Sequence, residues 1–114
     1  MLVDNRLGPN APAPGSGAPL ATHRAANSTN LHVHGLYQAA DRDNTFIAID
    51  PGASHAYRYK VHPSTGSSLL WYHAHLEGSS ELQLRGGMAG GFVVEQPEAA
   101  FRGWAEHLLV AQAF

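Results

Sequence analysis

From residue 29 onward the chain alternates between short apolar runs and clusters of turn-forming residues. Each run has the length and the β-branched, aromatic or alternating composition that is typical of a β-strand. The separators are rich in Gly, Pro, Asp, Asn and Ser, which favour turns. Strands at this spacing predict an all-β fold built as an antiparallel sandwich or barrel. The predicted strands cover residues 30–36, 45–49, 55–61, 68–73 and 90–95.

The remaining segments do not follow this pattern. Residues 8–29 are dominated by Gly, Pro, Ala, Ser, Thr and Asn, which predicts a long loop. Residues 77–88 could form either a loop or a short helical turn. Residues 97–106 are typical of a linker, and the apolar run at residues 107–110 predicts a further strand.

Composition and charge exclude several classes of partner. The chain has 114 residues, 44% of them hydrophobic and 14% charged, and its net charge is −2. Its seven Lys and Arg residues are scattered along the sequence, so we expect no nucleic-acid partner. No apolar run approaches the roughly 20 residues of a membrane-spanning helix, and residues 1–6 do not have the pattern of a signal peptide. We therefore expect no membrane partner either.

Cysteine is absent, whereas histidine is abundant and unevenly placed. Without cysteine, disulfides, zinc–thiolate sites, iron–sulfur clusters and thiolate-ligated copper are excluded within this chain. Four of the eight histidines form two His-x-His pairs, in LHVHG and WYHAH. Alternate residues of a strand project from one face, so each pair points one way. Two such strands side by side predict a polynuclear metal site made by His32, His34, His73 and His75.

The chemistry of this site follows from the imidazole ligands. Copper, zinc, nickel and iron accept imidazole, whereas calcium and magnesium prefer oxygen ligands. A single His-x-His pair on an exposed strand is common without a metal. Both pairs here have apolar or aromatic neighbours, and four buried imidazoles without partners would be costly, which favours metal binding. The isolated histidines are expected to be ordinary surface residues: His23, His55, His62 and His107.

Four segments in order, TNLHVHGL, DNTFIAIDPGASHAYRYKV, LLWYHAHLEGSS and LQLRGGMAGGFVVE, resemble the amino-terminal cupredoxin domain of laccase-like multicopper oxidases. The resemblance covers residues 29–95 and implies a cupredoxin-like Greek-key β-sandwich or barrel. In that family a trinuclear copper cluster lies between the first and last cupredoxin domains, each of which supplies four histidines. By motif, His32 matches a type 2 copper ligand, and the type 3 ligands are matched by His34, His73 and His75.

The family also implies an acidic residue that delivers protons during oxygen reduction. Asp43 is the best match for this catalytic role, and Asp41 is the alternative. The competing interpretation of either residue is an ordinary turn aspartate.

Some features depart from the family pattern. Ala74 and Glu77 stand where a proline and a third histidine are usual, but neither position is a usual ligand. The carboxy-terminal His-x-x-His-x-His and His-Cys-His motifs are absent, and with them the type 1 copper. The resemblance therefore implies three parts. Residues 1–96 would be a partial amino-terminal cupredoxin domain without its first strands, residues 97–106 a linker, and residues 107–114 the start of a second cupredoxin domain.

These observations lead to three functional hypotheses. The first is a copper-binding module of a multicopper oxidase, inactive alone, whose partners are copper ions, the remaining cupredoxin domains, dioxygen and a reducing substrate. The complete family members would be periplasmic or secreted, although this chain shows no signal peptide. The second is a stand-alone copper-binding or storage protein without catalysis. The third, a cupin-type mononuclear enzyme, is disfavoured because Tyr37 and Gln38 stand where its glutamate is expected.

Overall fold

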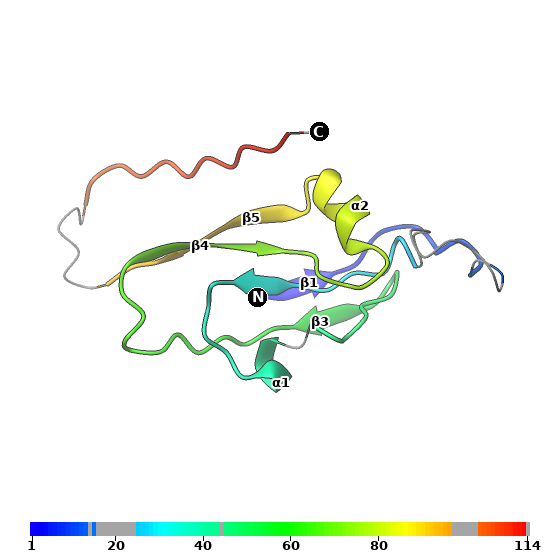
Figure 1. Cartoon of the computed structure of the whole chain (residues 1–114), viewed down its shortest axis with the longest axis horizontal. Coiled ribbons are helices and arrows are strands. Elements are labelled where there is room, and N and C mark those ends of the chain that lie inside the picture. Colours follow the sequence, from blue (N-terminus) through cyan, green and yellow to red (C-terminus); the bar gives the residue numbers. More distant parts are fainter. Residues whose placement is uncertain (14, 16–24, 44, 97–102, 114) are drawn as a thin grey trace.

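The computed structural model describes residues 1–13, 15, 25–43, 45–96 and 103–113 of the chain. The elements in order are β1 (Leu2–Asp4), β2 (His32–His34), α1 (Ala40–Asp43), β3 (Ser54–Ala56), β4 (Ser68–His73), α2 (Ser80–Arg85) and β5 (Ala89–Val94). The strands form two antiparallel sheets, one of β1 and β3 and one in the order β2-β4-β5 (Figure 1). The all-β prediction is confirmed, since the two helices are short.

The three-stranded sheet carries the histidine pairs. Its central strand, β4, pairs with β2 so that His32 lies opposite His73 and His34 lies opposite Trp71. On its other side β4 pairs with β5 along its whole length, from Ser68 to His73. The segment connecting β4 to β5 contains α2, which lies at the end of the sheet where β4 leaves it (Figure 1). This connection therefore returns the chain to the edge of β4 that β2 leaves free.

Glycine in β5 permits close packing of neighbouring groups. A Cβ atom at Gly90 would collide with the side chain of Tyr72 on β4, and one at Gly91 would collide with Leu108. The two absent side chains thus make room for an aromatic ring on one face and for the chain after residue 103 on the other.

The apolar core joins the two sheets. Leu31, Ile49 and Tyr57 are buried together, and further hydrophobic side chains pack against them: Val3, Ile47, Tyr59 and Tyr72. The main-chain N–H of Leu31 donates a hydrogen bond of 3.0 Å to the Tyr57 hydroxyl, so this buried ring also satisfies a buried amide. The residue immediately before the first histidine pair is therefore fixed in the core.

A buried polar cluster holds α2 against the segment that enters β2. The Gln83 side-chain amide donates to the carbonyl oxygens of Ala26 and Ser28, at 2.8 and 2.7 Å. Its amide oxygen accepts from the Thr29 hydroxyl at 2.9 Å, and the Ser79 hydroxyl donates to the Ser28 carbonyl at 3.0 Å. Because these buried groups are satisfied, the helix has a defined position relative to β2.

Several predicted elements differ from the observed ones. The strand at residues 68–73 is confirmed in full as β4, and the strand at 90–95 corresponds to β5. The prediction for 30–36 is too long, because only His32–His34 pairs with β4. Of the two alternatives left open for residues 77–88, the short helical segment is the one observed, as α2.

The strand predicted at residues 45–49 is wrong. Residues 45–46 form a turn, and Ile49 makes only an isolated bridge with Thr29. The Asn30 side chain donates to the carbonyls of Thr45 and Ile47, at 2.6 and 3.3 Å, and so replaces a strand ladder with side-chain hydrogen bonds.

The strand predicted at residues 55–61 is mostly wrong in its extent. Only Ser54–Ala56 pairs with β1, and this pairing ends with a hydrogen bond from the Tyr57 amide to the Met1 carbonyl. The alternation still holds in part, because Tyr57 is buried and Tyr59 half-buried whereas the basic residues are exposed.

The terminal and loop predictions are tested only in part. The strand predicted at residues 107–110 is wrong, because these residues are exposed and belong to neither sheet of the described chain. Within the predicted loop at 8–29, residues 8–13, 15 and 25–28 belong to no helix or strand, and the rest lie outside the described residues. Residues 97–102 of the predicted linker also lie outside them. No helix in the described ranges is long and apolar enough to cross a membrane.

Candidate metal centre

The register of β2 and β4 brings three histidines together. His32 and His73 are direct cross-strand partners, and His34 lies on the same face of β2 as His32. One ligand atom from each of these three side chains lies within 4.8 Å of the other two. The alternation of side chains and the antiparallel register are sufficient to produce this cluster.

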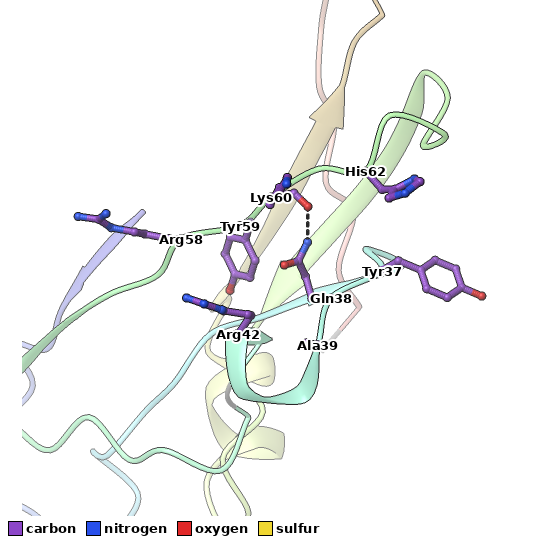
Figure 2. Close-up of a pocket in the computed structure, with 8 residues that line it drawn as sticks. All are labelled: Tyr37, Gln38, Ala39, Arg42, Arg58, Tyr59, Lys60 and His62. Carbon is purple, nitrogen blue, oxygen red and sulfur yellow. Dashed lines mark hydrogen bonds between the residues drawn. The ribbon is translucent and has the colours of Figure 1, made fainter.

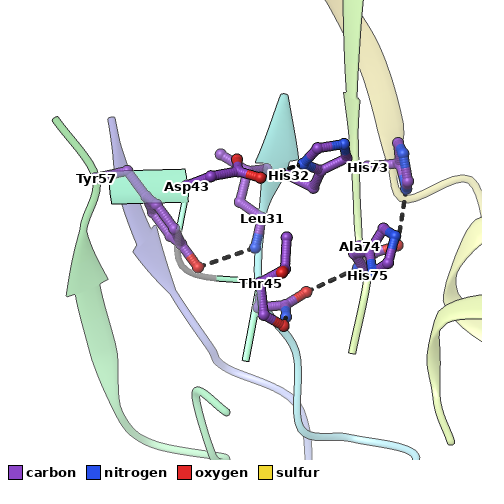
Figure 3. A network of polar contacts seen from close by, with 9 residues as sticks. Leu31, His32, Asp43, Thr45, Tyr57, His73, Ala74 and His75 are labelled. Atoms are coloured by element: carbon purple, nitrogen blue, oxygen red, sulfur yellow. Dashed lines mark hydrogen bonds and ion pairs between the residues drawn. The ribbon is translucent and has the colours of Figure 1, made fainter. Parts of the chain in front are cut away.

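His75 is positioned by a different device, because it lies two residues beyond the end of β4. Its main-chain N–H donates a hydrogen bond of 2.7 Å to the side-chain oxygen of the buried Asn30. Its ring centre lies 5.1 Å from that of His32 and 5.6 Å from that of His73. The fourth histidine is therefore adjacent to His32 and His73 (Figure 3).

The environment of His73 keeps its imidazole neutral and its Nε2 atom available. Its Nδ1 lies 2.9 Å from the Ala74 carbonyl oxygen, which can only accept, so Nδ1 carries the hydrogen. In the neutral ring Nε2 then carries a lone pair, and this atom is buried without a hydrogen-bond partner in the described structure. Burial and the neighbouring imidazoles of His32, His75 and His34 lower the pKa of His73, although the Ala74 hydrogen bond opposes this.

His32 is oriented by a carboxylate. Its Nδ1 lies 2.6 Å from Oδ2 of Asp43, the last residue of α1, and both side chains are largely buried (Figure 3). A carboxylate accepts from Nδ1–H, which leaves the His32 Nε2 lone pair free for a metal. The second oxygen of Asp43, Oδ1, is buried without a partner among the described residues. Of the two candidate acids, the structure brings Asp43 to the cluster and leaves Asp41 exposed.

Trp71 covers one side of the cluster. Its ring stacks on His73, with centres 4.1 Å apart and planes at 24°, and on His34, at 5.1 Å and 23°. From the sequence, Trp71 is expected only as an aromatic packing neighbour of the second histidine pair. The one sequence signal for the place of Trp71 beside His73 is the strand period of two, which puts residues 71 and 73 on the same face.

Three further histidines of the described residues lie outside the cluster. His55, in β3, packs edge-on against the Tyr57 ring. His62 is exposed beside Ser64, and His107 is exposed. His23 lies outside the described residues.

The donor set fits a metal that accepts imidazole. Imidazole nitrogens converge from two strands, and the buried Nε2 of His73 has no other partner among the described residues to compensate its desolvation. Copper, zinc and iron all accept such ligands, whereas calcium and magnesium require oxygen donors. The role of the four histidines as ligands stays a prediction.

Comparisons with known proteins agree with this chemistry. The multicopper oxidase family model matches residues 21–99, which is more than half of the chain. An iron transport multicopper oxidase of Saccharomyces cerevisiae is 33% identical over 84 residues, covering 65% of this chain and 12% of its own length. Laccase-2 of Trametes versicolor is 34% identical over 83 residues, covering 69% of this chain and 15% of its own length.

Other relatives give the same result. Laccase-4 of Thanatephorus cucumeris is 37% identical over 76 residues, which cover 61% of this chain and 13% of that protein. The chain thus spans a small fraction of the length of the curated relatives that it matches. The match covers both histidine pairs and the acidic segment between them, and it shows that this chain belongs to the multicopper oxidase family.

Proposed function

We propose that this chain is a copper-binding module that supplies half of a trinuclear copper site. His32 would hold a type 2 copper, and the type 3 coppers would be held by His34, His73 and His75. The observation that carries the proposal is that one ligand atom each of His32, His34 and His73 lies within 4.8 Å of the other two, while the ring centre of His75 lies 5.1 Å from that of His32. Family membership favours copper over the other metals that imidazole accepts.

When bound, copper would supply the one-electron redox steps by which dioxygen is reduced to water. The chain's own residues would present neutral nitrogen donors in fixed orientations. The Ala74 carbonyl fixes the His73 tautomer, and Asp43 fixes that of His32, so both Nε2 lone pairs are ready before the metal arrives. Trp71 excludes water from one side of the His73 and His34 rings.

Asp43 would have a second role during oxygen reduction. Its Oδ2 contacts His32, while Oδ1 is buried and has no partner in the described structure. An unpaired carboxylate oxygen at this place could take up a proton relayed from solvent and pass the same proton on toward the metal site. We infer that Asp43, rather than Asp41, holds the proton that the reaction consumes.

The proposed site would be completed by another cupredoxin domain of the same enzyme. Four imidazoles are half of the ligands that a trinuclear cluster of this family needs. This chain contains no cysteine for a type 1 copper, so electrons from a reducing substrate would enter through another domain. We therefore propose that the chain is inactive alone, and that the complete enzyme acts in the periplasm or outside the cell.

Copper titration of the 114-residue chain tests the proposal. Bound copper should be lost from the H32A and H73A variants and retained by H107A, which removes an exposed histidine outside the cluster. Circular dichroism of each variant separates loss of ligands from loss of folding. Unchanged copper content in H32A and H73A would overturn the assignment of the site. Oxygen consumption by the copper-loaded chain with a phenol would overturn the proposed inactivity.

A further inference from the structure

The pocket between α1 and the chain after β3 is basic but open. It has a volume of about 490 Å³, and three basic residues line it: Arg42, Arg58 and Lys60. Arg58 and Tyr37 point outward at its opposite ends (Figure 2), so its side chains do not converge on one place. A closer arrangement is found where the segment of residues 103–113 meets the sheet that carries the histidines.

This segment runs back alongside β5 and fills a gap in its row of side chains (Figure 1). The three atoms nearest to the position that a Cβ of Gly91 would take all belong to the Leu108 side chain. Farther along, the side-chain amide of Gln112 donates a hydrogen bond of 3.2 Å to the carbonyl oxygen of Leu84, at the end of α2. Leu108 therefore occupies the space that a side chain at residue 91 would fill.

The register places Leu108 on the same face of the sheet as the histidine cluster. Gly91 of β5 lies opposite Trp71 of β4, and Trp71 lies opposite His34 of β2. Residues that face each other in an antiparallel pair project to one face, with Cβ atoms about 4.5–5.5 Å apart. Across this row the side chains are therefore those of His34, Trp71 and, in place of a side chain from β5, Leu108.

Trp71 has a different neighbour on each side. Its stacking partners, His34 and His73, belong to β2 and β4. Toward β5 the opposite residue is Gly91, which has no side chain, so Leu108 stands beside the ring in that direction. Leu109 is 89% exposed and does not share this place. Within the apolar run at residues 107–110, the structure thus seats Leu108 against the sheet.

We propose that Leu108 is a positioning residue of the metal centre, which backs Trp71 and keeps its ring stacked on His34 and His73. Aromatic rings in contact have preferred relative orientations, so a ring held on one side restricts the rings on its other side. A site whose side chains are locked by packing presents its donors in fixed directions. Without Leu108 the Trp71 ring can tilt into the space above Gly91, and both imidazoles gain rotational freedom.

The first test uses the metal-free 114-residue chain and the NMR signals of its histidine ring protons. Protons above the face of an aromatic ring are shifted upfield, so stacking on Trp71 displaces the signals of His34 and His73 in this direction. L108A should move both sets of signals downfield. L109A is the matched control, because Leu109 is the adjacent leucine and is exposed. Equal His34 and His73 signals in L108A and L109A would overturn the proposal.

A transplanted side chain separates the place of the leucine from the folding of the segment. The double variant G91L/L108A returns a leucine to the same space, now attached to β5 itself. The backbone of Gly91 does not have a positive φ, so the strand accepts a side chain there. The His34 and His73 signals should return toward their original positions in this variant. Signals that stay where L108A places them, with an unchanged circular dichroism spectrum, would contradict the assigned role.

Copper affinity is a second readout, and it alone rests on the proposed function. L108A should lower this affinity by about fivefold, less than the tenfold or greater loss that is typical when a group bonded directly to a ligand is removed. G91L/L108A should recover most of the loss, and equal affinities of L108A and L109A would overturn the positioning role. A chain that binds no copper would refute the proposed function, whereas the metal-free spectra would still decide whether Leu108 holds Trp71.

Discussion

Replacement of Asp43 by asparagine isolates the contribution of its charge to the metal centre. The substitution keeps the shape of the side chain and an oxygen that can accept from His32 Nδ1. It removes the charge from a 2.6 Å contact whose two side chains are only 22% and 17% exposed. Hydrogen bonds to charged groups contribute about 1.5–3 kcal/mol, and neutral ones about 0.5–1.5 kcal/mol. The difference is about 1–1.5 kcal/mol, or about tenfold in affinity.

We therefore expect D43N to lower copper affinity by about tenfold, because His32 is less firmly held and its nitrogen is a weaker donor. The measurement is a competition titration of copper against a chelator of known affinity, at one pH. D41N is the matched control, since Asp41 lies on the same short helix but is exposed and should change affinity less than twofold. Equal affinities for D43N and D41N would refute the reasoning.

Three further predictions concern stability. Y57F removes the hydroxyl that accepts a buried main-chain amide, so urea unfolding should show a loss of about 1–3 kcal/mol; Y37F, at a 91% exposed ring, should lose less than about 0.5 kcal/mol. The pKa of His73 is lower in the folded chain than its ordinary 6.5, so the unfolded chain binds more protons near this pH. The metal-free chain should therefore lose stability as the pH falls below about 6.5. H73Q should flatten this part of the pH profile of stability, and an unchanged profile would contradict the argument. G90A should destabilise the sheet by about 1–3 kcal/mol through collision with a packed ring, whereas G66A, with open space around it, should not, and equal melting temperatures would contradict this.

The strands that carry the site could be predicted because they obey simple local rules. The run at residues 68–73 is apolar, aromatic and bounded by turn formers, and it forms β4 at those limits. The period of two holds for His32 and His34 in β2, and the register places His32 opposite His73. His75 lies beyond the end of β4, and its position depends on the hydrogen bond to Asn30. The predicted strand at 45–49 failed because Asn30 takes the carbonyls that a neighbouring strand would use, and no local pattern reveals a side chain 15 residues away.

The donor chemistry of this protein can be read from its residues alone. Four imidazoles in two His-x-His pairs and the absence of cysteine predict a site for a metal that accepts imidazole, such as copper, zinc, nickel or iron, because ligand preference depends on which donor atoms are present. Only the tertiary structure decided which acid reaches His32, that Trp71 covers the cluster, and that three scattered basic residues share one pocket. These outcomes depend on long-range packing and on where α1 and the chain after β3 meet, which local periodicity does not encode.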